Sequence, residues 1–233
     1  MKLCVIPARG GSKRIPRKNI RSFGGRPMIG WSIAAAHEAG CFDRIIVSTD
    51  DEDIAQVARD LGAEVPFLRP ATLSDDFTGT GPVTAHALGE AEKAGGTFDA
   101  VCCLYATAPF VRADDLRASL AKFKAQPCDY VFSVTTFAFP PARALRLKAR
   151  DRVEMLQPAQ EQTRSQDLDE VVHDAGQFYW GTAEAWHAGR PIFSSDSVAY
   201  MLPRHLVQDI DTEADWTRAE WMRKAMDAAD GAG

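Results

Sequence analysis

An α/β fold, in which helices cover both faces of a parallel sheet, is the architecture that the sequence predicts. Short apolar runs rich in strand-forming residues alternate with amphipathic stretches along most of the chain. The length of 233 residues, with 45% hydrophobic and 25% charged residues, is typical of one globular domain. No stretch approaches the roughly eighteen consecutive apolar residues that a membrane-spanning helix needs. We therefore expect a single domain over residues 1–233.

Strands are expected where short apolar runs are bounded by polar residues, glycine or proline. In chain order these runs are residues 2–8, 44–50, 64–70, 99–109, 129–137 and 197–203. A further strand-and-helix unit is expected at 175–189.

Helices are expected where apolar residues recur at helical spacing. These segments are residues 27–40, 50–62, 81–95, 112–126 and 213–229. Pro27 and Gly40 stand at the two ends of the first helix, as helix boundaries prefer. Acidic residues open the second helix and Gly62 ends it. The last residues, 230–233, are expected to fray.

The alternation of strands and helices breaks between residues 139 and 174. This stretch is polar and contains three prolines, so it could be an exposed extension, a lid or a dimerisation arm.

The composition argues against several classes of protein. The 27 basic and 32 acidic residues give a net charge of −5, whereas nucleic-acid-binding domains are usually basic. The five cysteines show no CxxC spacing, which argues against a disulfide framework and against a zinc site. Pro7 and Arg9 interrupt the first apolar run too early for a signal peptide. We expect a cytoplasmic protein with buried thiols and with no nucleic-acid or membrane partner.

A basic loop follows the first expected strand. Seven positive charges and no negative one lie between Arg9 and Arg26. Gly10 and Gly11 would let the backbone amides approach an anion, and the basic side chains would supply the charge. The alternative is a basic surface turn, because neither GxxxxGK[ST] nor GxGxxG is present. Ligands of parallel sheets bind beyond the carboxyl ends of the strands, where residues 8–14, 48–51, 106–109 and 133–137 are expected.

The loop IPARGGSKRIPRKN (6–19) resembles the amino-terminal signature of the sugar-acid cytidylyltransferases, which make CMP-linked nonulosonic acids. The resemblance continues through VSTDDEDIA, VPFLRP, SDDFTGT, LYATAPF, TRSQDL, HDAGQFYWG and LPRHLVQDIDTEADW, in the expected order. It implies a nucleotide-diphospho-sugar transferase fold, a Rossmann-like three-layer sandwich. It also implies that 139–174 is a dimerisation extension of a homodimer. SDDFTGT, TRSQDL and HDAGQFYWG most resemble the branch acting on pseudaminic acid.

The reaction that the resemblance implies joins CTP to a nonulosonic acid and releases pyrophosphate. A triphosphate beside a substrate carboxylate needs positive charge, which accounts for the basic loop. By resemblance, Arg9 and Lys18 are catalytic. The nucleotide is bound by Arg9, Gly11, Ser12, Lys13, Lys18, Asn19, Arg69 and Thr80.

A magnesium ion, Mg²⁺, is the expected cofactor. Asp209 and Asp211 are two residues apart, so on an extended segment their carboxylates lie on one face. Such carboxylates together with substrate phosphates commonly hold Mg²⁺. The alternative is that Asp211 or Thr212 only caps the last helix. Asp75 and Asp76 could likewise be helix caps.

The expected sugar-binding residues are Tyr105, Arg164, Gln177 and Tyr179. Tyr105 stands where sialic acid enzymes tend to have glutamine, which favours a less polar sugar. Arg164 suits a sugar carboxylate, because its planar guanidinium matches that group. The alternative substrates are legionaminic acid and N-acetylneuraminic acid. A non-catalytic binding protein and a transferase for another nucleotide or a hexose phosphate are the alternative classes.

Overall fold

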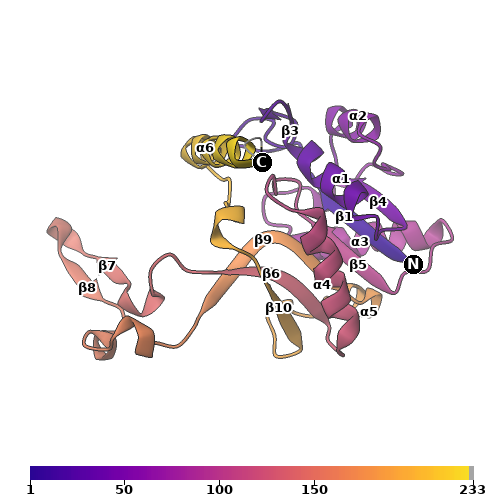
Figure 1. The fold of residues 1–233 in the computed structure, drawn as a ribbon. Coiled ribbons are helices and arrows are strands. Elements are labelled where there is room, and N and C mark those ends of the chain that lie inside the picture. The colour runs from indigo at the N-terminus through magenta and orange to yellow at the C-terminus, as the bar shows by residue number, and fades with distance from the viewer. Residues whose placement is uncertain (231–233) are drawn as a thin grey trace.

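A computed structural model describes residues 1–230, so the fraying expected for 230–233 lies outside the described residues except at Asp230, which is the last residue of the final helix. One six-stranded sheet forms the centre of the molecule (Figure 1), in the strand order β10-β6-β9-β5-β1-β4. Its strands are β1 (Lys2–Pro7), β4 (Arg44–Ser48), β5 (Ala100–Leu104), β6 (Tyr130–Thr136), β9 (Val172–Gly181) and β10 (Ser197–Met201). The expected α/β architecture is confirmed.

The expectation of an entirely parallel sheet is wrong for β9. This strand pairs antiparallel with both β5 and β6, whereas the other neighbours are parallel. In the described chain no α-helix lies between β6 and β9, and β9 takes an interior position of the sheet, between β6 and β5. The chain instead leaves β6 at Thr136 and re-enters at Val172, which pairs with Thr136. Antiparallel pairing needs no crossover, so β9 runs back along β6.

The strand expected at 64–70 is also wrong. Only Glu64 makes a bridge, to Ile46 of β4, and the Arg69 amide donates to the Thr49 carbonyl. Pro66 and Pro70 have no amide hydrogen, so a regular ladder cannot continue through this segment.

Six α-helices accompany the sheet within residues 1–230. They are α1 (Met28–Ala39), α2 (Glu52–Asp60), α3 (Thr80–Lys93), α4 (Ala113–Ala125), α5 (Ala183–His187) and α6 (Glu213–Asp230). Helix α1 ends at Gly40, whose φ of 59° is the left-handed conformation that glycine adopts at little cost. Asp51 begins α2, because its carboxylate accepts the amides of Asp53 and Ile54.

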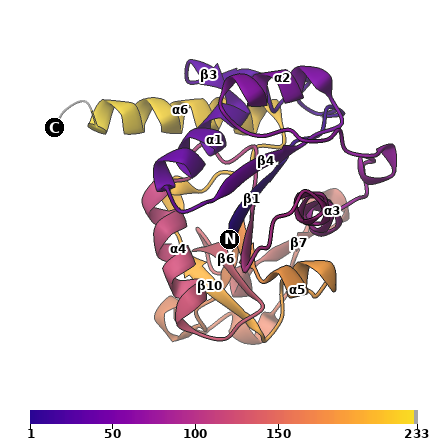
Figure 2. The same ribbon diagram turned by 90° about the vertical axis from the view of Figure 1, so that its right-hand side faces the viewer.

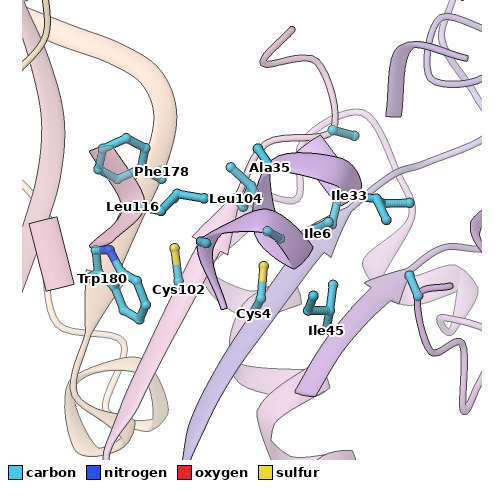
Figure 3. Close-up of a cluster of buried hydrophobic side chains, with 14 of the residues drawn as sticks. Cys4, Ile6, Ile33, Ala35, Ile45, Cys102, Leu104, Leu116, Phe178 and Trp180 are labelled. Atoms are coloured by element: carbon cyan, nitrogen blue, oxygen red, sulfur yellow. The ribbon is translucent and has the colours of Figure 1, made fainter. Parts of the chain in front are cut away.

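The helices form two layers on opposite faces of the sheet (Figure 2). Residues of α1, α2 and α4 pack on one face, and residues of α3 and α5 pack on the other. Strand β1 serves both layers because successive side chains alternate between faces. Cys4 and Ile6 face the first layer (Figure 3), and Leu3 and Val5 face the second.

The cysteines are free within the described chain, as expected. Cys4, Cys102 and Cys103 are buried in the core, and burial raises the pKa of Cys103 to about 12. Such thiols are apolar packing groups at neutral pH.

A third, smaller hydrophobic cluster lies beside the sheet, between the basic loop and the start of α6. Its buried members are Ile15, Phe23, Met28, Phe110, Leu206, Ile210, Trp216 and Ala219. Ile15 comes from the basic loop and Ile210 stands between the two candidate metal ligands. This cluster therefore joins two segments that are almost 200 residues apart in the sequence.

Residues 139–171 leave the body of the molecule as an extension (Figure 1). Its two-stranded hairpin consists of β7 (Leu145–Leu147) and β8 (Val153–Met155). The remaining short elements of the chain are β2 (Ser22–Phe23), β3 (Arg26–Pro27), η1 (Ala71–Leu73), η2 (Pro141–Arg143), η3 (Ala149–Asp151), η4 (Pro158–Gln160), η5 (Ser165–Asp167) and η6 (Arg204–Leu206). No described helix combines the length and the apolar character required to cross a membrane.

Candidate active site

The basic loop lines a cavity of about 670 Å³ at the carboxyl end of β1. The lining includes the expected nucleotide-binding residues Arg9, Ser12, Lys13, Lys18, Asn19, Arg69 and Thr80. Arg14, Asp76, Tyr105 and Asp211 complete much of its wall. We call this the phosphate cavity, because its basic side chains converge on one space. Gly11 is exposed, and no atom lies within 4 Å of a side chain built there.

Each positive charge in the phosphate cavity has a carboxylate partner. Arg9 Nη1 lies 2.7 Å from Asp76 Oδ1, and Lys13 Nζ pairs with the other oxygen of Asp76. Arg14 Nη2 lies 2.9 Å from Asp211 Oδ2. Lys18 Nζ lies 3.5 Å from Asp211 Oδ1. Asp76 and Asp211 thus hold four of these cationic side chains around the cavity, and the fifth, Arg69, pairs with Asp50.

Hydrogen bonds fix the loop from behind. The Asn19 amide donates to the Arg9 carbonyl at 2.9 Å, and the Gly10 amide donates to Asp50 Oδ1 at 3.0 Å. A Cβ atom at Gly10 would lie 2.6 Å from Asp51 Oδ2, so glycine is needed for this close approach. These contacts hold the backbone of the loop in place beside the carboxyl ends of β1 and β4.

Arg69 forms the inner wall of the phosphate cavity. It is only 6% exposed and donates to Ser74 Oγ at 3.2 Å and to Asp50 Oδ1 at 3.4 Å. Burial lowers the pKa of its guanidinium, and Asp50 partly opposes that shift. The side chain is thus held in a fixed place beside Thr80, at the start of α3.

Neither Asp75 nor Asp76 caps α3, which answers the alternative left open by the sequence. Asp75 accepts the amides of Phe77 and Thr78 and the hydroxyl of Thr78, which closes a tight turn. Asp76 pairs with Arg9 and Lys13. Helix α3 begins after Gly79 without a side-chain cap.

Asp209 and Asp211 flank the buried Ile210. Thr212 makes the helix cap, because its hydroxyl accepts the Asp215 amide while Asp215 accepts the Thr212 amide. This capping box leaves the Asp211 side chain available to the basic loop. Lys18 also donates to the Ile210 carbonyl at 2.6 Å, which ties the loop to this segment.

The two carboxylates are close enough to influence each other. Burial and then the neighbouring Asp211 raise the pKa of Asp209 above its ordinary value. Carboxylate oxygens are hard ligands of the kind that Mg²⁺ takes in proteins. Residues 1–230 contain no group of three or more metal-binding side chains, so further ligands would have to come from phosphate and water. The donor set fits Mg²⁺ on those terms.

A second cavity, of about 1,080 Å³, adjoins the first. Tyr105 lines both, so one side chain stands between the two spaces. The lining of the second cavity contains five basic side chains and two carboxylates: Arg112, His173, Arg204, His205, Arg218, Asp174 and Asp209. We call it the sugar cavity, since it combines cationic groups with carboxylate acceptors beside the phosphate cavity.

Three polar groups form a chain at the boundary of the two cavities. The rings of Tyr105 and Tyr179 lie 5.2 Å apart, and the Tyr179 hydroxyl donates to Asp174 Oδ2 at 2.6 Å. The Gly176 amide donates to the other oxygen of Asp174 at 3.0 Å. Burial, then the neighbouring Tyr105 and Asp174, raise the pKa of Tyr179, so its hydroxyl stays protonated.

The other expected sugar-binding residues differ in their placement. Tyr179 is 2% exposed and lies behind Tyr105. Gln177 is 4% exposed and its amide donates to the Leu206 carbonyl. Arg164 lies on the extension, where it pairs with Asp167 and is mostly exposed. Of the four expected residues, only Tyr105 lines the sugar cavity in the described chain.

Several residues of the site were not expected from the sequence. The sequence indicated Asp76 only as a possible helix cap, and Asp174 was not among the expected site residues; their motifs, SDDFTGT and HDAGQFYWG, were the available signal. Arg204 lies within LPRHLVQDIDTEADW. Arg112 and Arg218 are on helices, where an arginine does not differ in pattern from an ordinary surface residue.

Comparison with known proteins identifies the family of the chain. The family model described as Cytidylyltransferase matches residues 3–208. A "Pseudaminic acid cytidylyltransferase" of Campylobacter jejuni subsp. jejuni is 44% identical, covering 95% of this chain and 96% of that one. A "CMP-N,N'-diacetyllegionaminic acid synthase" of Legionella pneumophila is 30% identical, covering 94% of each chain.

Solved structures agree on the fold. A CMP:2-keto-3-deoxy-manno-octonic acid synthetase, complexed with CTP, superposes with a TM-score of 0.72 at 16% identity and covers 97% of this chain and 99% of its own. A 4-diphosphocytidyl-2C-methyl-D-erythritol synthase from Anaerococcus prevotii has a TM-score of 0.63 at 14% identity, covering 96% and 98%. The resemblance that the motifs indicated is confirmed, and the chain belongs to the cytidylyltransferase family.

Proposed function

We propose that this protein joins CTP to pseudaminic acid, giving CMP-pseudaminic acid and pyrophosphate. The observation that carries this proposal is the shared wall: Tyr105 separates a cavity lined by the basic loop from a second, larger cavity. Two substrates bound on either side of one residue can react with each other. The choice of sugar follows from the named activity of the Campylobacter relative.

The chemistry requires an anomeric hydroxyl to attack the α-phosphate and to lose its proton to solvent, while the bond from the α-phosphorus to pyrophosphate breaks and charge builds on the leaving group. Arg9, Lys13 and Lys18 line the phosphate cavity and would neutralise that charge. Arg69 and Thr80, at the inner wall, would contact the nucleoside. Fixed positions of both substrates, rather than a general base, supply most of the rate enhancement.

Asp209 and Asp211 would hold Mg²⁺, which polarises the phosphate oxygens and offsets their charge when bound. Alanine at either position should abolish turnover and leave the melting temperature nearly unchanged. Isothermal titration of Mg²⁺ into the protein with a non-hydrolysable CTP analogue provides a readout that is separate from activity. Normal Mg²⁺ binding and activity in one variant would remove that residue from the site.

The sugar cavity suits a sugar acid. Arg112, Arg204 and Arg218 are candidate partners for the sugar carboxylate. Asp174 is an acceptor only, so it would bind an N–H or O–H of the substrate with its remaining lone pairs. The ring of Tyr105 offers an apolar wall, which favours a deoxygenated sugar over a more hydroxylated one.

The active form is proposed to be a homodimer. The extension presents Leu145, Leu147 and Val153 to solvent at 57%, 71% and 60% exposure, which is costly for a free subunit. A second copy of the chain would cover them, and Arg164 would reach the partner's sugar cavity. Light scattering should give twice the subunit mass, and Leu147→Glu should shift it towards the monomer. A wild-type monomer at concentrations where the enzyme is active would refute this arrangement.

Pyrophosphate release from CTP and Mg²⁺ with matched concentrations of pseudaminic, legionaminic and N-acetylneuraminic acids tests the proposed activity. We expect the highest kcat/KM with pseudaminic acid. Equal rates with the three sugars would refute the preference for pseudaminic acid and indicate a cytidylyltransferase that accepts nonulosonic acids in general. Binding of CTP and sugar without any pyrophosphate release would favour a non-catalytic protein.

A further inference from the structure

Asp76 occupies the position in the phosphate cavity where an anionic ligand would be expected. One carboxylate oxygen lies 2.7 Å from Arg9 Nη1 and the other pairs with Lys13 Nζ. Both cations line the same cavity as Asp76 itself. The hydrogen bonds from Lys13 and then Arg9 lower the pKa of Asp76, so the group is ionised at neutral pH. A negative charge therefore already sits on the cations that would bind a phosphate.

The loop that carries Asp76 is built to present this side chain. Asp75 accepts two backbone amides and one hydroxyl from residues 77 and 78, which closes the turn around it. The Asp75 carbonyl accepts a further hydrogen bond from Arg9 Nη1 at 3.0 Å. Asp76 is thus held in the lining of the cavity by a local turn, while its side chain accepts hydrogen bonds from Arg9 and Lys13 and, within residues 1–230, from no other group.

We propose that Asp76 sets the anion affinity of the phosphate cavity by competing with the ligand's phosphate groups for Arg9 and Lys13. This inference rests on the proposed use of the cavity for the CTP phosphates. A guanidinium and an ammonium bound to Asp76 must exchange that partner for phosphate oxygens when the nucleotide enters. The same carboxylate returns to the cations when pyrophosphate leaves.

The competition has a direct chemical consequence. Pyrophosphate is the product that makes only phosphate contacts, so its affinity depends on these cations more than that of any other reactant. An intramolecular carboxylate weakens its binding and so limits product inhibition. CTP loses the same contribution but keeps its contacts to the nucleoside. Asp76 therefore weakens both ligands by the same factor, and pyrophosphate, which has no nucleoside contacts, is left as the more weakly held of the two.

Replacement of Asp76 by asparagine provides the test, because the amide keeps the shape and removes the charge. Isothermal titration with pyrophosphate, without divalent cations and at low salt, should give a Kd about three- to tenfold lower than that of the wild type, since exposed ion pairs contribute modestly. The difference should shrink as salt is raised. The inhibition constant for pyrophosphate in the reaction should fall in parallel.

Asp53→Asn is the matched control. Asp53 pairs with Arg17 of the same loop at 2.8 Å, but neither residue lines the phosphate cavity. The control should leave the pyrophosphate Kd unchanged, and cytidine, which has no phosphate, should bind all three proteins equally. Unchanged or weaker pyrophosphate binding by Asp76→Asn would overturn the competition. Absence of any CTP or pyrophosphate binding by the wild type would instead overturn the proposed phosphate cavity and the inference with it.

Discussion

Truncation of Ile15 to alanine should lower the stability of the fold and also weaken CTP binding, because Ile15 positions the basic loop. Ile15 is fully buried in the third hydrophobic cluster, although charged residues surround it in the sequence. Ile210 belongs to the same cluster and lies between Asp209 and Asp211. Loss of the Ile15 side chain therefore removes packing between the two segments that form the phosphate cavity.

The magnitude follows from the buried volume. The substitution removes three carbon atoms, about 2.4 kcal/mol at roughly 0.8 kcal/mol for each buried methylene, and leaves a cavity in addition. We expect the free energy of unfolding to fall by about 3 kcal/mol, and the melting temperature by about 6–12 °C for a chain of this size. If about 1 kcal/mol of that loss appears as opening of the loop in the folded state, the Kd for CTP rises about fivefold.

Ile33→Ala is the matched comparison. Ile33, a residue of α1, is 1% exposed and packs in the main core rather than in the third cluster (Figure 3). Both variants should lose similar stability in urea or thermal unfolding. Titration of CTP at a temperature where both remain folded should show a weaker Kd only for Ile15→Ala. Equal CTP affinities in the two variants would falsify the idea that the third cluster positions the loop.

Three further predictions concern single side chains. Gly10→Ala should lower the free energy of unfolding by about 1–3 kcal/mol, because its Cβ would collide with Asp51. Gly11 has open space around it, so Gly11→Ala should change the free energy of unfolding by less than about 0.5 kcal/mol. A denaturation assay measures both. Tyr105→Gln should narrow a preference of at least about tenfold for pseudaminic over N-acetylneuraminic acid, measured as kcat/KM for pyrophosphate release; an unchanged ratio would count against Tyr105 as the selecting residue. Tyr179→Phe frees one oxygen of Asp174 and should raise the sugar KM about fivefold with little change in the CTP Kd, and equal effects on both ligands would contradict its local role.

The sequence predicts the local features of this fold well. Pro27 and Gly40 bound α1 within a residue, and the acidic start of the next helix contains its capping residue, Asp51. These boundaries depend on neighbours a few residues away, which a pattern can represent. The direction of β9 cannot be predicted from such local patterns, because it depends on where the chain re-enters the sheet after the extension. The missing strand at 64–70 reflects its two prolines, whose lost amides outweighed the apolar pattern.

The candidate site shows the same limit at the level of side chains. The alternation of residues around Ile210 predicts that Asp209 and Asp211 share one face of an extended segment. It does not predict which other segment of the chain packs against that face. The meeting of Asp211 with Lys18 depends on Ile15 and Ile210 being buried in one cluster. The sequence predicted a basic loop that binds an anionic substrate, but it did not predict that the cations of this loop pair with Asp76 and Asp211. The charge pattern predicts that a loop can bind phosphate, whereas only the folded arrangement identifies the carboxylates with which its cations are paired.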